Sequence, residues 1–303
     1  MPKKQSLIIP SPAASVLSIG NRMRRWSNRI RRQPNTQPLG DYPSDVVDSQ
    51  GCEFGYEMFY HLPYAYHLFK QGLLKRTVSC KATKCFYFFS PQHNEVYDKR
   101  DFVEHFDSIA QVPHERPDFQ RWEPPPLAEH YRDRIDFGFE KPPLLVFNKY
   151  NFEWYHPPIN FLSRPFLERL VDSLQNEFTI IYNRPTSHIV HDHMPVGELN
   201  EKEALRDRGV ILAEELYAQF DHVSFNEFQL CLLAQSKMRI AAQGGATYLN
   251  ALFPGRLMVY HRYGGEQIYG NYNDFPAMGV EDFSVFNNEL EMLDQLTGQR
   301  LAA

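Results

Sequence analysis

The amino-acid sequence predicts an α/β protein whose main sheet is parallel and covered by helices on both faces. Strand-like apolar segments alternate with amphipathic helical segments over residues 143–285, and such alternation produces parallel strands joined by crossover helices. The 303 residues are 43% hydrophobic and 23% charged, as is ordinary for a soluble globular protein. This length accommodates one large domain or two smaller ones, each with its own core.

The first 40 residues differ from the rest of the chain in charge. They contain eight of the 32 Lys and Arg residues and no Asp or Glu, so residues 41–303 hold 24 basic and 37 acidic residues, a net charge of −13. A body this acidic does not attract nucleic acid, so we expect no nucleic-acid partner.

Residues 14–32 carry one apolar stripe at helical spacing and six arginines between Arg22 and Arg32. The stripe consists of Val16, Ile19, Met23, Trp26 and Ile30. This pattern predicts an amphipathic arm that lies on an anionic membrane surface and holds the protein there peripherally. Two alternatives are a basic tail without fixed structure and an organelle transit peptide.

The remaining composition predicts a cytoplasmic protein without a bound metal. The four cysteines Cys52, Cys80, Cys85 and Cys231 complete no zinc spacing, and free thiols indicate a reducing compartment. No stretch of about 18 apolar residues is present, and no secretory signal is recognisable. The segment His188–His193 matches no zinc motif, so we interpret it as a solvated loop, and His93 and His114 are weaker candidates still.

Residues 41–140 are predicted to form an N-terminal α/β domain. A turn over Gly51–Gly55 leads into a helix from Tyr56 to Gln71, which Gly72 ends. The aromatic segment Lys84–Phe89 reads as a buried strand, because it is short, apolar and followed by Ser90 and Pro91. The proline run Pro124–Pro126 predicts the approach to a linker.

Residues 141–285 are predicted to form a second, Rossmann-like domain, and residues 286–303 a C-terminal helix. Ser224 and Glu227 form a capping box at the start of one helix. The expected strands are 144–147, 178–182, 210–212, 238–242 and 256–261, and the expected helices are 163–175, 224–236, 244–252 and 287–296.

The turn Gln243-Gly244-Gly245-Ala246-Thr247 lies between a predicted strand and a predicted helix. Glycines at such a place let an anion approach the backbone N–H groups closely, which favours phosphate binding. The turn is neither a GxGxxG fingerprint nor a P-loop. The alternative is a tight turn that requires small residues only for packing.

Residues 224–255 resemble the donor half of GT-B glycosyltransferases, and most closely glycosyltransferase family 61. The family's segment HGAxLxNxLF, followed by Pro-Gly, is matched at Gly245, Ala246, Asn250 and 252–255, whereas Gly244 and Tyr248 depart from it. The resemblance implies a GT-B-like fold with two Rossmann-type domains facing a cleft. It also implies metal-independent, inverting transfer from a nucleotide-diphosphate sugar to a hydroxyl of a glycan or lipid-linked acceptor, without a further cofactor.

Two cations are candidates for holding the donor's diphosphate. Lys149 and Arg184 each follow a predicted strand of the second domain, and ligands of doubly wound sheets bind at the carboxyl ends of strands. The alternative for each is an ordinary surface cation. The full set predicted to bind the donor is Lys149, Arg184, Ser224, Glu227, Gln243, Gly244, Gly245, Ala246 and Thr247.

Glu53, Glu57 and His61 are the candidates for a catalytic base that faces the cleft from the first domain. A base must deprotonate the acceptor hydroxyl, and a carboxylate or a neutral imidazole is suited to this. The alternative is that both glutamates only stabilise the positive end of the following helix. Two other functions stay open: a GT-B-shaped sugar-nucleotide epimerase, and a non-catalytic partner subunit with this fold.

Overall fold

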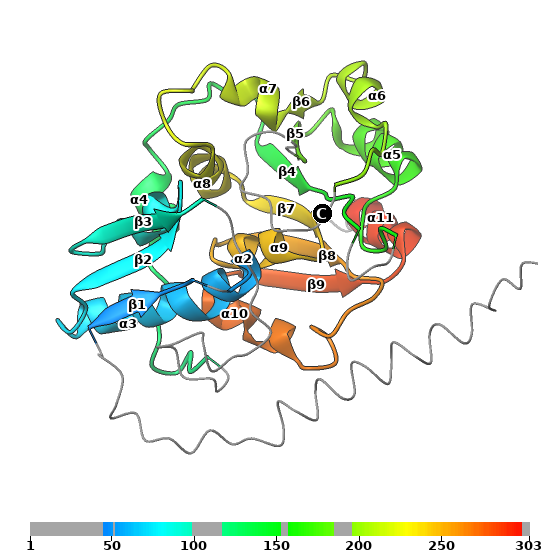
Figure 1. Ribbon diagram of the computed structural model, residues 1–303. Helices are drawn as coiled ribbons and strands as arrows, with labels where there is room; N and C mark the ends of the chain where they lie inside the picture. Colours follow the sequence, from blue (N-terminus) through cyan, green and yellow to red (C-terminus); the bar gives the residue numbers. More distant parts are fainter. Residues whose placement is uncertain (1–44, 51, 99–116, 153–156, 185–195, 299–303) are drawn as a thin grey trace, which may run out of the picture. The chain divides into compact units, whose positions relative to one another are not determined.

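The computed structural model describes residues 45–50, 52–98, 117–152, 157–184 and 196–298 (Figure 1). The chain divides into two units, 1–41 and 42–303, and all described residues belong to the second. The arm predicted over residues 14–32, the histidines of 188–193 and His114 lie outside the described residues. No helix in the described ranges has both the length and the hydropathy needed to cross a membrane.

The larger sheet is parallel throughout, and its described strands follow the order β6-β5-β4-β7-β8-β9. This is the doubly wound order in which the first strand lies in the middle and the direction of winding reverses beside it. The strands are β4 (Pro143–Phe147), β5 (Thr179–Asn183), β6 (Ile211–Leu212), β7 (Met238–Ala242), β8 (Arg256–Tyr260) and β9 (Asp282–Phe286). The prediction of a mixed α/β fold with a parallel sheet is confirmed.

Successive residues of these strands enter two different cores, so both faces of the sheet are covered. On β4, Leu145 and Phe147 enter one core and Leu144 and Val146 the other. In Figure 1, α8 (Phe225–Gln235) and α9 (Gly245–Ala251) lie on the side of the smaller sheet, whereas α5 (Arg164–Leu174) and α11 (Glu289–Gly298) lie on the other. The helices that connect the parallel strands therefore cover both faces of the sheet, as predicted.

Hydroxyl caps fix the starts of two of these helices. The Oγ of Ser163 accepts a hydrogen bond from Phe166 N at 3.3 Å, and the Oγ of Ser224 accepts one from Glu227 N at 3.1 Å. These side chains satisfy backbone donors that the first turn of a helix leaves open. Both helix starts were expected from the sequence and are confirmed. The shorter helices are α4 (Leu127–Tyr131), α6 (Lys202–Arg206), α7 (Ala213–Tyr217) and α10 (Phe275–Met278).

The smaller sheet is also parallel and has the order β1-β2-β3. Its strands are β1 (Val46–Asp48), β2 (Arg76–Cys80) and β3 (His93–Tyr97). Side chains of this part share one core with the larger sheet: Phe59 and Tyr131 belong to the same buried cluster as Leu145 and Phe228. Each predicted domain thus contains one sheet, but residues 42–303 form a single compact unit.

The Pro124–Pro126 run does not separate two bodies. It leads directly into α4, whose Leu127, Ala128 and Tyr131 are buried in the shared core. The side chain of Gln235, at the end of α8, donates to the carbonyl of Ile135 at 2.6 Å. The interpretation of this run as the approach to a linker is therefore wrong, because the segment packs on the helices of the larger sheet.

The helix predicted from Tyr56 to Gln71 is present and runs from Phe54 to Lys70. It consists of α2 (Phe54–Tyr56), the π-helical turn η1 (Glu57–His61) and α3 (Leu62–Lys70). Pro63 explains the wide turn, because proline has no N–H and its ring crowds the carbonyl four residues earlier. Gly72 follows the helix with φ +70°, so the predicted glycine stop is confirmed.

The segment Lys84–Phe89 is not a strand. Residues Lys84–Tyr87 form the 3₁₀ helix η2, and Cys85, Phe86 and Tyr87 are all buried in the shared core. Short apolar runs do not distinguish a buried strand from a buried helical turn. Here three consecutive side chains point into the core, which the two-residue period of a strand does not allow.

We expect Gly255→Ala to destabilise the protein more than Gly209→Ala. Both glycines have positive φ, +96° and +79°, but a Cβ at Gly255 would lie 2.5 Å from the carbonyl oxygen of Lys237, whereas nothing lies within 4 Å at Gly209. Left-handed backbone alone costs an alanine about 1–2 kcal/mol, and the clash adds roughly 1–3 kcal/mol. Urea unfolding of the two variants measures the difference, and equal losses would contradict the steric argument.

Candidate functional site

The candidate site lies at the carboxyl edge of the larger sheet between β4 and β7, where the strand order reverses. This switch point is the usual ligand crevice of doubly wound sheets. Lys149 follows β4, and Gln243 and Gly244 follow β7, so the fold brings these three predicted residues together. The Nζ of Lys149 donates a hydrogen bond to Oε1 of Gln243 at 3.2 Å.

Gly244 gives Lys149 room to lie against the turn. Its backbone has φ 149° and ψ −169°, a region that is nearly restricted to glycine. A Cβ at Gly244 would lie 3.1 Å from Nζ of Lys149. Glycine is therefore required at this position both by the backbone and by the lysine that crosses it.

Gln243 joins the lysine to a carboxylate on the next loop. Its Oε1 also accepts from Nδ2 of Asn160 at 2.9 Å, and its Nε2 donates to Oε1 of Glu266. The Oδ1 of Asn160 accepts the N–H groups of Arg262 and Tyr263, each at 2.9 Å. Asn160 thus holds the loop that follows β8 beside the Gly244 turn. The side chain of Gln243 is bonded both to the cation Lys149 and to the anion Glu266.

His261 completes the cluster from the carboxyl end of β8. The residue is 2% exposed, and its Nε2 lies 3.8 Å from Oε2 of Glu266. Neither Nδ1 of His261 nor Oε2 of Glu266 has a hydrogen-bond partner among the described residues. Burial lowers the pKa of His261, a shift that Glu266 opposes and Lys149 reinforces. Buried polar atoms without partners are costly, so the structure leaves hydrogen bonds of this pair unmade beside Gln243 and Lys149.

The start of α2, at Phe54 and Gly55, lies against the start of α9 at this site. Gly55 of α2 and Gly245 of α9 pack backbone to backbone: a Cβ on Gly55 would lie 3.4 Å from Cα of Gly245. Glu53 precedes α2 and is partly exposed. Burial raises the pKa of Tyr248 on α9, and the carboxylates of Glu266 and Glu53 raise it further. Glu53 immediately precedes Phe54 and Gly55, which pack on Gly245, so it lies near the start of α9.

The close packing changes the expected role of Gly245. A Cβ on this residue would lie 3.1 Å from Cδ1 of Phe54 and 3.2 Å from the backbone N of Gly55. The space beside Gly245 is thus filled by α2, and the alternative of a small residue needed for packing is correct at this position. An anion bound at this turn would therefore lie beside Gly244 and Lys149.

We expect Gly245→Val to destabilise the fold by about 1–3 kcal/mol, the usual cost of overpacking a close contact. The branched side chain would press on Phe54 and on the backbone of Gly55. Urea unfolding measures the effect. An unchanged free energy of unfolding would show that the helices separate without cost.

Glu57 and His61 do not face an open cleft, contrary to expectation, because both are buried. The Oε1 of Glu57 accepts hydrogen bonds from Oγ of Ser49 at 3.0 Å and from the hydroxyl of Tyr87 at 2.8 Å. These bonds tie the wide helical turn to the smaller sheet. Of the three candidate bases, only Glu53 lies at the surface beside α9.

Arg184 follows β5 as expected but is held in a buried ion pair. Its Nε lies 2.6 Å from Oε1 of Glu201, and a second nitrogen lies 3.2 Å from Oε2. The hydroxyl of Tyr182 donates to the same carboxylate at 2.9 Å. The charge of Arg184 is therefore matched inside the protein, which favours a structural role over a contact with a ligand.

The remaining predicted residues make contacts within the fold. Ser224 caps α8, and Glu227 pairs with Arg134 at 3.1 Å. Thr247 is buried and donates from Oγ1 to the carbonyl of Ala242 at 3.1 Å, and the carbonyl of Ala246 accepts from Asn250 at 2.8 Å. No hydrogen bond within the described ranges connects Ser224 or Glu227 to the Gly244 turn.

The sequence analysis missed Asn160, His261 and Glu266. His261 follows a predicted strand, so the rule that selected Lys149 could also have selected it. Asn160 and Glu266 lie in loops, where nothing in the sequence distinguishes them. Among the described residues, no group of three or more His, Cys, Asp or Glu side chains is arranged to hold a metal ion, and the four cysteines are buried and form no disulfide. Comparison of the chain with protein-family models, curated proteins and solved structures finds no match.

Proposed function

We propose that the protein is a GT-B-like glycosyltransferase that moves a sugar from a nucleotide-diphosphate sugar to an acceptor hydroxyl, with inversion and without a metal. The observation that supports this best is the meeting of Lys149 with the Gly244 turn at the switch point of the sheet. A cation beside exposed backbone at this edge suits a diphosphate. The resemblance of residues 224–255 to donor domains is the reason why we assign a nucleotide sugar, and not a nucleotide alone, as the ligand.

The other polar groups of the cluster have roles in this proposal. Lys149 neutralises the diphosphate as it leaves, which stabilises the charge that develops in the transition state. Glu266, whose side chain is 20% exposed, binds hydroxyl groups of the transferred sugar, and His261 is buried beside it. Hydrogen bonds with Gln243 fix the positions of Lys149 and Glu266. The acceptor, a glycan or a lipid-linked glycan, approaches from the side of Glu53, and the basic arm of residues 14–32 keeps the enzyme at a membrane.

A panel of UDP, GDP, CMP and ADP tests the donor site by thermal shift, because a ligand that binds only the folded state raises Tm. We expect one nucleoside diphosphate to raise Tm, and no shift from any of the four would contradict the proposal. The matching nucleotide sugar then separates the three functions. A transferase releases nucleoside diphosphate when acceptor is present, an epimerase converts the donor alone, and a non-catalytic subunit does neither.

Glu53→Gln is expected to lower turnover by roughly 10²- to 10⁴-fold, the usual contribution of a positioned base, and to leave nucleotide affinity unchanged. The reason is that Glu53 is partly exposed at the start of α2 and immediately precedes Phe54 and Gly55, which pack on Gly245 of α9. Glu129→Gln, which removes an exposed carboxylate on α4, is the control. If Glu53→Gln turns over at the wild-type rate, the base is another residue.

A further inference from the structure

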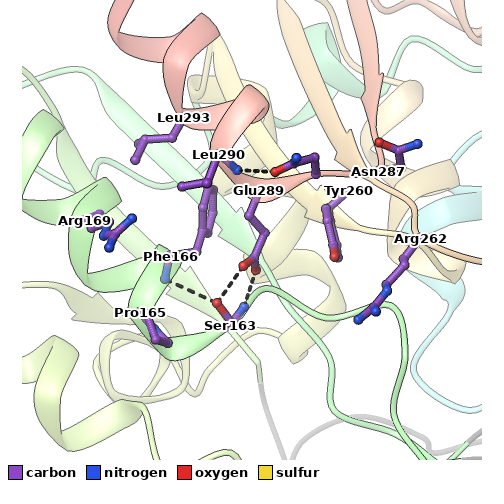
Figure 2. A pocket seen from close by; sticks show the side chains of 11 residues that line it. Ser163, Pro165, Phe166, Arg169, Tyr260, Arg262, Asn287, Glu289, Leu290 and Leu293 are labelled. Atoms are coloured by element: carbon purple, nitrogen blue, oxygen red, sulfur yellow. Dashed lines mark hydrogen bonds between the residues drawn. The ribbon is translucent and has the colours of Figure 1, made fainter.

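A cavity of 610 Å³ opens on the face of the larger sheet that carries α5 and α11 (Figure 2). It lies where α5 begins, where β8 and β9 end and where α11 begins. None of the residues assigned to donor binding or catalysis lines it. A volume of this size is typical of small-molecule sites, so the cavity requires its own explanation.

The lining of this cavity is positively charged. Arg169 and Arg262 are exposed on opposite sides of it in Figure 2, and neither forms an ion pair with a described residue. Glu289 is the one acid in the lining, and it is already bound: its carboxylate accepts from N of Ser163 at 2.5 Å and from Oγ of Ser163 at 2.7 Å. Since this carboxylate also meets the positive end of α5, its charge is compensated locally, and the two arginines are left for a ligand.

The exposed parts of the lining suit a sugar better than a nucleobase. The rings of Phe166 and Tyr260 are only 3% and 7% exposed, so they offer little face for a base to stack on. Leu290 is 56% exposed and can contact the C–H face of a sugar ring. Asn287 and Asn288 are exposed and line the same cavity. The Oδ1 of Asn288 accepts from N of Leu290 at 2.9 Å, so its NH₂ group is left to donate to hydroxyl groups, whereas the amide of Asn287 can both donate and accept.

We infer that this cavity binds an acidic oligosaccharide, with carboxylates of the glycan held by Arg169 and Arg262. Guanidinium groups bind carboxylates through two parallel hydrogen bonds, and two guanidinium groups that line one cavity suit a ligand with more than one acidic unit. None of the residues assigned to donor binding or catalysis lines this cavity, although Arg262 directly follows His261 in the chain, and the existence of the cavity does not depend on the proposed transfer reaction. It would hold a charged glycan on the face opposite the smaller sheet.

Calorimetric titration of the full chain with an oligogalacturonate hexamer tests the inference. Maltohexaose, a neutral hexamer, and UMP are titrated in parallel. We expect the acidic hexamer to bind and the neutral hexamer not to bind. Arg169→Met and Arg262→Met should each weaken binding of the acidic hexamer at least tenfold, the lower end for a charge-assisted contact, and added salt should weaken it as well.

Arg164→Met is the matched control, because Arg164 lies on the same helix but is paired with Glu168 at 2.8 Å. It should leave binding of the hexamer unchanged, and so should Lys149→Met, which removes the cation of the donor site. Absence of binding, equal binding of the neutral hexamer, arginine-dependent binding of UMP in its place, or an equal loss in the Arg164 variant each overturns the inference. If none of the four nucleotides raises Tm but the acidic hexamer still binds, the proposed transferase function is refuted and the inference about this cavity stands.

Discussion

Arg184→Met is expected to lower the free energy of unfolding by about 3–5 kcal/mol, the typical cost of breaking a buried ion pair. The side chains of Arg184 and Glu201 are 4% and 0% exposed, so removal of the arginine leaves a carboxylate inside the protein. Among the described residues, the hydroxyl of Tyr182, at 2.9 Å, is the side-chain donor that would remain. Urea unfolding at neutral pH measures the loss.

Two further variants distinguish the cost of an unpaired buried carboxylate from the cost of losing the contacts of an arginine. Arg184→Met combined with Glu201→Leu should cost less than Arg184→Met alone, because no unpaired charge remains and apolar replacements of buried pairs are often tolerated. Arg206→Met removes an arginine from the exposed pair with Glu215, whose side chains are 50% and 49% exposed, and should cost at most about 1 kcal/mol. Equal losses in the single and double variants would contradict the argument.

Lys149→Met is expected to weaken binding of the preferred nucleoside diphosphate by about 10- to 150-fold. This corresponds to the 1.5–3 kcal/mol that a hydrogen bond to a charged group typically contributes. The lysine lies against Gly244 at the switch point, and its Nζ contacts Gln243. Methionine keeps most of the side-chain volume and removes only the charge and the donors. Calorimetric titration measures the affinity.

Lys237→Met is the matched control for this prediction. Lys237 is exposed and immediately precedes β7, so it lies at the opposite edge of the sheet from Lys149. The two variants change the net charge equally, and only Lys149→Met should weaken the nucleotide. A similar loss in both would mean that overall charge governs binding, and normal binding by Lys149→Met would move the diphosphate elsewhere.

Local rules predicted the larger sheet well, because its signals lie within a few residues of one another. Ser163 and Ser224 were recognised as helix starts from their own neighbours. Lys149 and Gly244 were linked by a rule about strand ends, and the fold places them in contact. Such features require no knowledge of distant partners.

The rest depended on tertiary contacts that one sequence does not reveal. Glu57 was expected in a cleft, but the rotation of its helix points it toward Ser49 and Tyr87. Arg184 was expected to hold a ligand, but Glu201 lies 17 residues further on and no spacing rule connects the two. In both cases a polar residue at a suitable element end had a partner inside the protein.

The single core that joins the two sheets limits the motions available to this molecule. Phe59 and Tyr131, from the part that contains the smaller sheet, are buried together with Leu145 and Phe228 of the part that contains the larger one. Opening the two parts like a hinge would expose this apolar surface to water, which costs about 25 cal/mol for each Å². The unit that contains both sheets should therefore melt in one cooperative transition rather than in two.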